Sequence, residues 1–327
     1  MATNGEFENV YKELKNNANL LNIKYRDTSK KSSSFVFETD NICNELISTF
    51  KINNEKFNLF FNQACSGSGH EKRNLSILRS SALCALLFFH NVNKVHIEIP
   101  VDNKKVSFDK VFFEIKNAVI KEPSNIDIVL VSSKNHIILF LESKFTEYYL
   151  DKKDDYDIKK AYLYHEIGKD FYNSDALAKL GLSSDFTILK KIKKNEKEEE
   201  FFKVISENNK SYIEGIKQMI SHYIGLSNFV RRKNIYGRDS RNIELKKLFA
   251  SGYSVYLGEI LFDGFENDDI IKSREDYEEK YKKLAKLLNQ HSNNTSKTKI
   301  KCLSEVLKYS CLKDFVNTTI KKFYFGE

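Results

Sequence analysis

Tryptophan is absent from this 327-residue chain, proline occurs twice, and the five cysteines include no Cys-x-x-Cys pair. An odd number of scattered cysteines gives no disulfide framework, and Cys84 lies inside an apolar run that is typical of a buried thiol. The seven histidines show no spacing typical of zinc ligands. We therefore expect a reduced, cytoplasmic protein without a zinc site.

Long hydrophobic runs are also missing. The longest apolar stretches, 82–89 and 137–141, are far shorter than the roughly 20 residues that span a bilayer. The first ten residues are polar and do not resemble a signal peptide. We expect no membrane partner.

Charge and size indicate a globular protein with a polyanionic partner. Lys and Arg number 53 against 45 Asp and Glu, for a net charge of +8 and a pI near 8.9. This excess favours nucleic acid only weakly, because the balance is mixed. With 41% hydrophobic residues the chain can bury at least one large core. We expect an N-terminal helical region (1–65), a core (66–265) and a C-terminal helical extension (266–327).

Hydrophobic periodicity predicts the main elements. The pattern favours an α/β fold in which helices cover a sheet, because two neighbouring runs of Ile, Leu and Val are apolar on both faces. The charged run 189–203 has helical spacing and is typical of a solvated helix face. The expected helices are 70–90, 211–230, 274–290 and 300–315, and the expected strands are 95–100, 111–120, 125–133, 136–145 and 252–262.

The two central strands carry the residues of greatest chemical interest. If a two-residue turn at Lys134-Asn135 joins them, Asp127 lies directly opposite Glu142. The Cβ atoms of such a pair lie about 4.5 to 5.5 Å apart. Lys144, two residues beyond Glu142, points to the same face. Were the turn one residue longer, Asp127 would slip out of register and Glu114 would become the candidate for the second acid.

Two carboxylates and a lysine at one strand end suit a hard divalent ion. Mg²⁺ prefers oxygen ligands and is usually held by one or two carboxylates, with water and substrate phosphate completing the shell. Lys144 would orient or activate the attacking water and offset the charge that develops on the phosphate. The pattern thus predicts hydrolysis of a phosphodiester.

Pro123, Asp127, Glu142 and Lys144 in this arrangement resemble the PD-(D/E)XK nuclease superfamily, which includes many restriction enzymes. The proline is not adjacent to the aspartate, which is a common departure from the pattern. The resemblance covers about 190 residues and implies a restriction-endonuclease-like core in which a mixed sheet is flanked by helices. It also implies Mg²⁺, with Mn²⁺ as a substitute, held by both acids and by the carbonyl of Ser143.

Two further features of the superfamily have counterparts in this chain. An acid on the first core helix corresponds to Glu71, a candidate metal ligand on the same helical stripe as Leu75; the alternative is an acid that stabilises the start of a helix. A Gln-x-x-x-Tyr pattern corresponds to Gln218, where His222 replaces the tyrosine. Solvent exposure of Gln218 and His222 is the alternative reading.

The Glu-x-Lys triplet alone has little specificity, since it recurs at Glu13, Glu114 and Glu244. Glu13 and Glu244 lie in helical surroundings, whereas Glu114 lies in a strand without a matched aspartate. An ordinary cross-strand ion pair is the structural alternative for Asp127, Glu142 and Lys144. Three charges at the end of a buried sheet would be costly without a function, which favours the catalytic reading.

A basic loop supplies the candidate nucleic-acid contacts. Its side chains would suit phosphate binding and base stacking, although an exposed basic loop is the equal alternative. With Gln218, the candidates are Arg231, Arg232, Lys233, Tyr236 and Arg238. We expect a DNA nuclease of restriction, phage defence or DNA repair, with RNA open as substrate and a homodimer suited to cutting both strands. The alternative is a catalytically silent relative that binds nucleic acid or protein.

Overall fold

The structure of the chain is a computed structural model. It describes residues 10–26, 36–39, 41–66, 75, 77–78, 80–120, 123–150, 155–192, 198–206, 213–231, 239–294 and 300–327.

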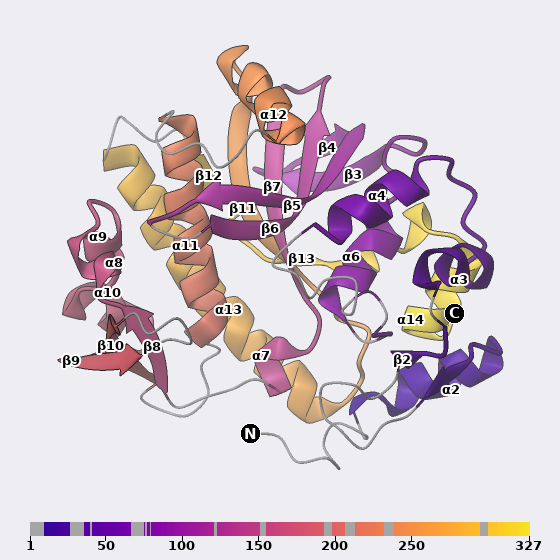
Figure 1. Cartoon of the computed structure of the whole chain (residues 1–327), viewed down its shortest axis with the longest axis horizontal. Coiled ribbons are helices and arrows are strands. Elements are labelled where there is room, and N and C mark those ends of the chain that lie inside the picture. The colour runs from indigo at the N-terminus through magenta and orange to yellow at the C-terminus, as the bar shows by residue number, and fades with distance from the viewer. Residues whose placement is uncertain are drawn as a thin grey trace.

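A six-stranded mixed sheet forms the centre of the molecule (Figure 1). Its first three strands in sequence form an antiparallel meander, β11 then runs parallel to β7, and two short strands run parallel to β11. The strands are β5 (Lys110–Ala118), β6 (Pro123–Ser132), β7 (Ile137–Lys144), β11 (Ser254–Leu261), β12 (Ile300–Cys302) and β13 (Leu307–Lys308). The expected α/β class, with a mixed central sheet flanked by helices, is confirmed.

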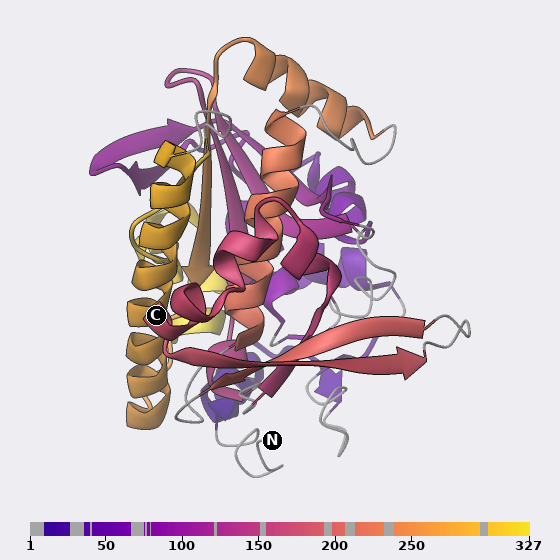
Figure 2. The same cartoon turned by 90° about the vertical axis from the view of Figure 1, so that its left-hand side faces the viewer.

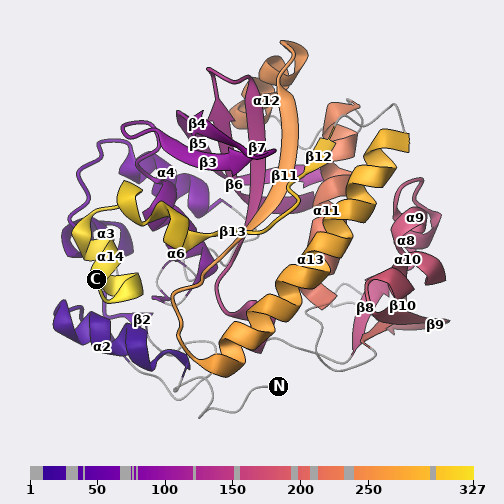
Figure 3. The same cartoon turned by 180° about the vertical axis from the view of Figure 1, so that it is seen from behind.

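Helices cover both faces of this sheet, which explains the apolar character of its central strands. Two long helices, α11 (Ile213–Val230) and α13 (Asp268–Asn294), lie side by side along one face (Figures 1 and 3). The other face packs against α4 (Phe57–Ala64), α6 (Ser81–Phe89) and the 3-10 helix η1 (Tyr309–Phe315). The central strands therefore meet hydrophobic side chains above and below.

The connection from β7 to β11 contains an inserted unit that lies outside α11 (Figure 2). Its strands form a separate antiparallel sheet in the order β8-β10-β9. Because α11 is held between the central sheet and this insert, almost every residue along it is buried. The elements of the connection before α11 are α7 (Glu147–Leu150), β8 (Asp155–Lys159), α8 (Ala161–Tyr164), α9 (Gly168–Phe171), α10 (Ser174–Lys179), β9 (Leu182–Ile192) and β10 (Glu198–Ser206).

The helical spacing of the charged run 189–203 does not produce a helix in its described residues, which form the end of β9 and the first part of β10. Lysines and glutamates that could pair along a helix pair instead across the two strands, as Lys190 does with Glu198. Phe202 and Val204 alternate with less buried neighbours, so the strand buries one face.

Two other helices differ from expectation. Helix α6 begins at Ser81, where the side chain of Ser80 accepts the hydrogen bond of the Leu83 N–H and caps the helix, whereas residues 70–74 of the expected helix lie outside the described residues. Segment 300–315 forms β12, β13 and η1 instead of a helix. The parallel pairing of this segment with β11 satisfies backbone groups of that strand, which outweighs the local helical pattern.

Helices 211–230, 274–290 and strand 252–262 are confirmed as α11, α13 and β11. The strand expected at 95–100 is half of a hairpin, β3 (Ile97–Val101) with β4 (Lys104–Phe108). The remaining elements are α2 (Lys12–Leu20), β1 (Tyr25–Arg26), β2 (Val36–Phe37), α3 (Ile42–Thr49), α12 (Ser240–Ala250) and α14 (Thr318–Phe325).

The first and last helices of the described chain pack together (Figure 1). The side-chain amide of Asn17 on α2 donates to the carbonyl oxygen of Phe323 on α14 at 3.0 Å. No helix among the described residues combines the length and apolar character needed to cross a bilayer.

Candidate functional site

The pairing of β6 with β7 has the register expected from the sequence. Ser132 pairs with Ile137 and Ile128 with Leu141, so the next residues outward are Asp127 and Glu142. The turn is wider than expected, since residues 133–136 lie outside the ladder. The longer turn leaves the residue pairs of β6 and β7 unchanged, and the predicted register is confirmed.

Glu142 is the centre of a buried polar network. Its Oε1 accepts a hydrogen bond from the Lys144 ammonium at 2.7 Å, and its Oε2 lies 2.9 Å from Nε2 of His222. Lys144 also donates to Oε1 of Gln218 at 2.7 Å. Glu142, Lys144 and His222 are only 4%, 3% and 2% exposed. Buried charges of this kind are tolerated because each finds a partner.

The same contacts decide the ionisation of Glu142. Burial alone would raise the pKa of its carboxyl group. The nearby Lys144 and His222 outweigh that effect and lower the pKa to about 2. The carboxylate is therefore ionised at neutral pH.

Asp127 has the opposite electrostatic balance. Its Oδ2 accepts a hydrogen bond from the Ser143 N–H at 2.8 Å. Burial, followed by repulsion from Glu142 and Glu114, raises the pKa of Asp127 well above its usual value, and Lys144 offsets this only in part. Carboxylates that repel one another in this way form a place where a cation would be stabilised.

Ser143 lies between the two acids but points its side chain to the opposite face of the sheet. Its Oγ donates to the carbonyl oxygen of Ser81 at 3.2 Å and lies 2.8 Å from the hydroxyl of Tyr309. Any role of Ser143 toward Asp127 thus comes from its backbone.

Glu259 is a member of the network that sequence reasoning missed. It pairs with Glu142 in the parallel register of β11 and β7, and its side chain is completely buried. The hydroxyl of Tyr277 donates to Oε2 at 2.7 Å, while Oε1 has no hydrogen-bond partner among the described residues. Burial raises the pKa of Glu259 to about 8. The signal was an acid within an otherwise apolar central strand, Tyr256 to Leu261.

His222 matches the pattern of the superfamily only loosely, and solvent exposure is the alternative that the sequence leaves open. The structure excludes that alternative for His222, which is only 2% exposed and contacts Glu142 on the central sheet. Its Nδ1 lies 2.5 Å from Oγ of Ser124, a residue that sequence reasoning did not single out. Gln218 contacts Lys144 rather than standing free in solvent.

Of the remaining predicted residues, the structure describes only Arg231, which is held away from this network. Arg231 forms an ion pair with Glu166 of the insert connection. The other candidates, Glu71, Arg232, Lys233, Tyr236 and Arg238, lie outside the described residues.

A cavity of about 570 Å³ adjoins the network. The start of β6, one side of α11 and the insert form its walls, and Ser124, Gln218 and His222 line it. Since Gln218 and His222 contact Lys144 and Glu142 from this side, they separate the cavity from the two charges. A small ligand in the cavity would meet these two side chains first.

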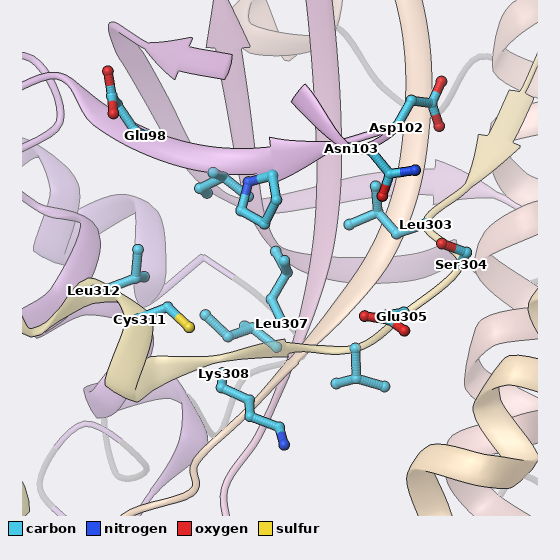
Figure 4. A pocket seen from close by; sticks show the side chains of 14 residues that line it. Glu98, Asp102, Asn103, Leu303, Ser304, Glu305, Leu307, Lys308, Cys311 and Leu312 are labelled. Atoms are coloured by element: carbon cyan, nitrogen blue, oxygen red, sulfur yellow. The ribbon is translucent and has the colours of Figure 1, made fainter. Parts of the chain in front are cut away.

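A second pocket lies elsewhere. It has a volume of about 340 Å³ and lies between the β3 strand and the segment 303–312, with Glu98, Glu305 and Lys308 around an apolar floor (Figure 4). None of the residues of the buried network lines this pocket, so it is separate from the candidate site.

No three His, Cys, Asp or Glu side chains within the described ranges are grouped closely enough to hold a metal ion in this arrangement. Comparison of the chain with protein-family models, curated proteins and solved structures gives no match. The candidate function therefore depends on the geometry of the network itself.

Proposed function

We propose that the chain is a metal-dependent nuclease with a restriction-endonuclease-like core that hydrolyses DNA. The observation that carries this proposal is the register of β6 and β7, which sets Asp127 opposite Glu142 at the end of a buried hairpin. Lys144 follows on the same strand and already contacts Glu142. Two acids and a lysine on adjacent central strands are the arrangement expected for Mg²⁺-assisted phosphodiester hydrolysis.

The chemistry of the donor set suits a hard cation. Asp127 and Glu142 offer carboxylate oxygens, and Mg²⁺ commonly takes only one or two protein carboxylates, with water and phosphate as its other ligands. The raised pKa of Asp127 supports the same reading, because a cation would relieve its repulsion from Glu142 and Glu114.

Access to Glu142 requires a shift of Lys144, whose ammonium occupies Oε1. Gln218 already accepts a hydrogen bond from the same ammonium, so Lys144 keeps one partner after it leaves Glu142. A bound Mg²⁺ would polarise the phosphate and lower the pKa of a water molecule. Lys144, held by Gln218, would then stabilise the negative charge that develops on the phosphate oxygens.

The proposal is tested by DNA cleavage in the presence of Mg²⁺ or Mn²⁺. We expect Glu142→Ala and Lys144→Ala to abolish cleavage without unfolding the protein. The matched controls are Glu244→Ala and Lys246→Ala, which alter a Glu-x-Lys triplet on helix α12. Cleavage by both site variants at the wild-type rate would refute the proposal, and parallel assays on RNA would determine the nucleic acid.

A catalytically silent protein that binds nucleic acid or a protein partner is the second candidate. It is favoured by one observation: both oxygens of Glu142 already have partners within the chain, so the network is satisfied without a metal. A ligand that binds only the folded state raises the melting temperature. A rise with Mn²⁺ that is lost in Asp127→Asn favours the nuclease, and no rise favours the silent protein. A homodimer, suited to cleavage of both strands, is part of the nuclease proposal and is tested by its mass in solution.

A further inference from the structure

We propose that Ser124 is an activated nucleophile, aligned by His222 and Glu142, and that the adjacent cavity accepts a small carboxylic ester. The three side chains come from β6, α11 and β7, so only the folded chain brings them together. This second activity is distinct from the proposed hydrolysis of DNA and does not depend on it.

The three residues form a continuous chain of hydrogen bonds. Oγ of Ser124 lies 2.5 Å from Nδ1 of His222, and Nε2 of the same ring lies 2.9 Å from Oε2 of Glu142. A hydroxyl, an imidazole and a carboxylate in this order are the groups that activate a serine, and such sites are recognised by geometry rather than by sequence position.

The positions of the protons follow from the partners. The Lys144 ammonium donates to Oε1 of Glu142 at 2.7 Å, which leaves Oε2 as the acceptor that faces the ring of His222. Nε2 of His222 must therefore carry the hydrogen that points to Oε2. In the tautomer that carries its hydrogen on Nε2, Nδ1 is an acceptor, and the Ser124 hydroxyl donates to it. This arrangement of hydrogen bonds is the one that a nucleophilic serine needs.

The serine faces a space that a ligand can enter. Ser124 is partly exposed and, with His222, lines the cavity of about 570 Å³, whereas Glu142 lies behind the ring. Val119, Ile120 and Phe201 contribute apolar surface to the same cavity. Asp157, Lys159, Glu214 and Lys217 line the cavity as well, so its apolar part suits only a short acyl chain.

An amide with no hydrogen-bond partner among the described residues lies on the strand next to Ser124. Asn117 pairs with Ser124 across β5 and β6, and it is buried. Its amide nitrogen has no hydrogen-bond partner among the described residues. Asn117 does not line the cavity, so this amide adds a polar group next to the serine strand rather than a contact with the ligand.

Water is the only reactant that the hydrolysis needs besides the ester. Oγ of Ser124 bonds to the ester carbonyl carbon while its proton passes to Nδ1 of His222. The carbon–oxygen bond to the alcohol then breaks, and the alcohol takes that proton. Water attacks the acyl-serine in the same way and releases the carboxylic acid.

The test is covalent labelling of the folded protein with a fluorophosphonate, without nucleic acid or metal. The phosphorus bonds to Oγ and fluoride leaves, so peptide mass spectrometry locates the adduct. We expect one adduct per chain at Ser124, none in Ser124→Ala, and labelling slowed by about 10²-fold or more in His222→Gln because the general base is lost.

Ser221 provides a matched control. It lines the same cavity, but its hydroxyl contacts the hydroxyl of Tyr162 at 2.7 Å rather than a histidine. Ser221 in the wild-type protein should therefore carry no adduct. Ser227 on the same helix does not line the cavity and donates to the carbonyl oxygen of Tyr223 at 2.8 Å, so Ser227→Ala should label like the wild type and should release p-nitrophenol from p-nitrophenyl acetate with the same initial burst. Absence of an adduct at Ser124 in the wild-type protein, or equal labelling of Ser221, would overturn the proposal. Because the wild type is the decisive sample, misfolding of a variant does not affect that outcome.

Discussion

Glu114 lies opposite Asp127 in the antiparallel pairing of β5 with β6, and its backbone has a φ of +51°. The residues on either side, Phe113 and Ile115, pair regularly with Ile128 and Ile126. A left-handed conformation within a strand is unfavourable for any residue except glycine. Strain of this kind gathers at functional sites, and here it accompanies a buried acid beside the proposed metal ligand.

The strain at Glu114 can be measured with two substitutions that both remove its side chain. Glu114→Gly relieves the backbone strain, whereas Glu114→Ala keeps a Cβ atom at positive φ. We expect the glycine variant to be the more stable by about 1 kcal/mol, since the relief of roughly 1–2 kcal/mol exceeds the entropy cost of glycine. Urea denaturation measures the difference, and an alanine variant of equal or greater stability would contradict it.

Glu259 should make stability fall as the pH rises. Its pKa is about 8 in the folded protein, against 4.5 for a free side chain, so between these values the folded state holds a proton that the unfolded state has lost. The proton bound to Glu259 therefore stabilises the folded state at low pH. As the pH rises toward 8 this stabilisation is lost, and the free energy of unfolding falls by roughly 1 kcal/mol per pH unit. Glu259→Gln should lack this decline in urea denaturation from pH 5 to 8. If the free energy of unfolding changed equally with pH in the wild type and in Glu259→Gln, Glu259 would not titrate in this range.

His90 should have the opposite effect. Burial, only partly offset by hydrogen bonds to backbone carbonyls, lowers its pKa from 6.5 to about 4. Between these values the unfolded state binds a proton that the folded state lacks, so stability decreases as the pH falls from about 6.5 to 4. In His90→Gln this loss should disappear, and its stability relative to the wild type should improve as the solution is acidified. A difference in the free energy of unfolding between the two proteins that stays constant over this pH range would contradict the lowered pKa of His90.

Gly168 should not tolerate a side chain. A Cβ atom there would lie 2.4 Å from the carbonyl oxygen of Tyr162, a backbone atom that cannot move away alone. We expect Gly168→Ala to cost about 1–3 kcal/mol. Because Tyr162 lines the cavity beside Ser124, its displacement should also reduce fluorophosphonate labelling. A melting temperature within 1 °C of the wild type, roughly the error of the method, would contradict the clash.

The sequence alone determined the parts of the site that depend on local geometry. Side chains alternate along a strand, and apolar residues on both faces of β6 and β7 mark them as central strands. These two rules are enough to place Asp127, Glu142 and Lys144 on one face of the sheet, and the observed register agrees. The same periodicity located α11 and β11. The catalytic role of the three residues is a proposal, because geometry on a strand does not itself define a reaction.

Only the tertiary structure decided which distant residues join them. Glu259 reaches Glu142 through parallel pairing after a long crossover, and no local pattern encodes that register. His222 meets Glu142 because α11 packs on the sheet, and the insert covers the outer side of the same helix, a layer that the helix's own periodicity cannot reveal. Segment 300–315 likewise has a helical pattern but gains more from pairing with β11. In each case a contact between residues far apart in the chain outweighs the local preference.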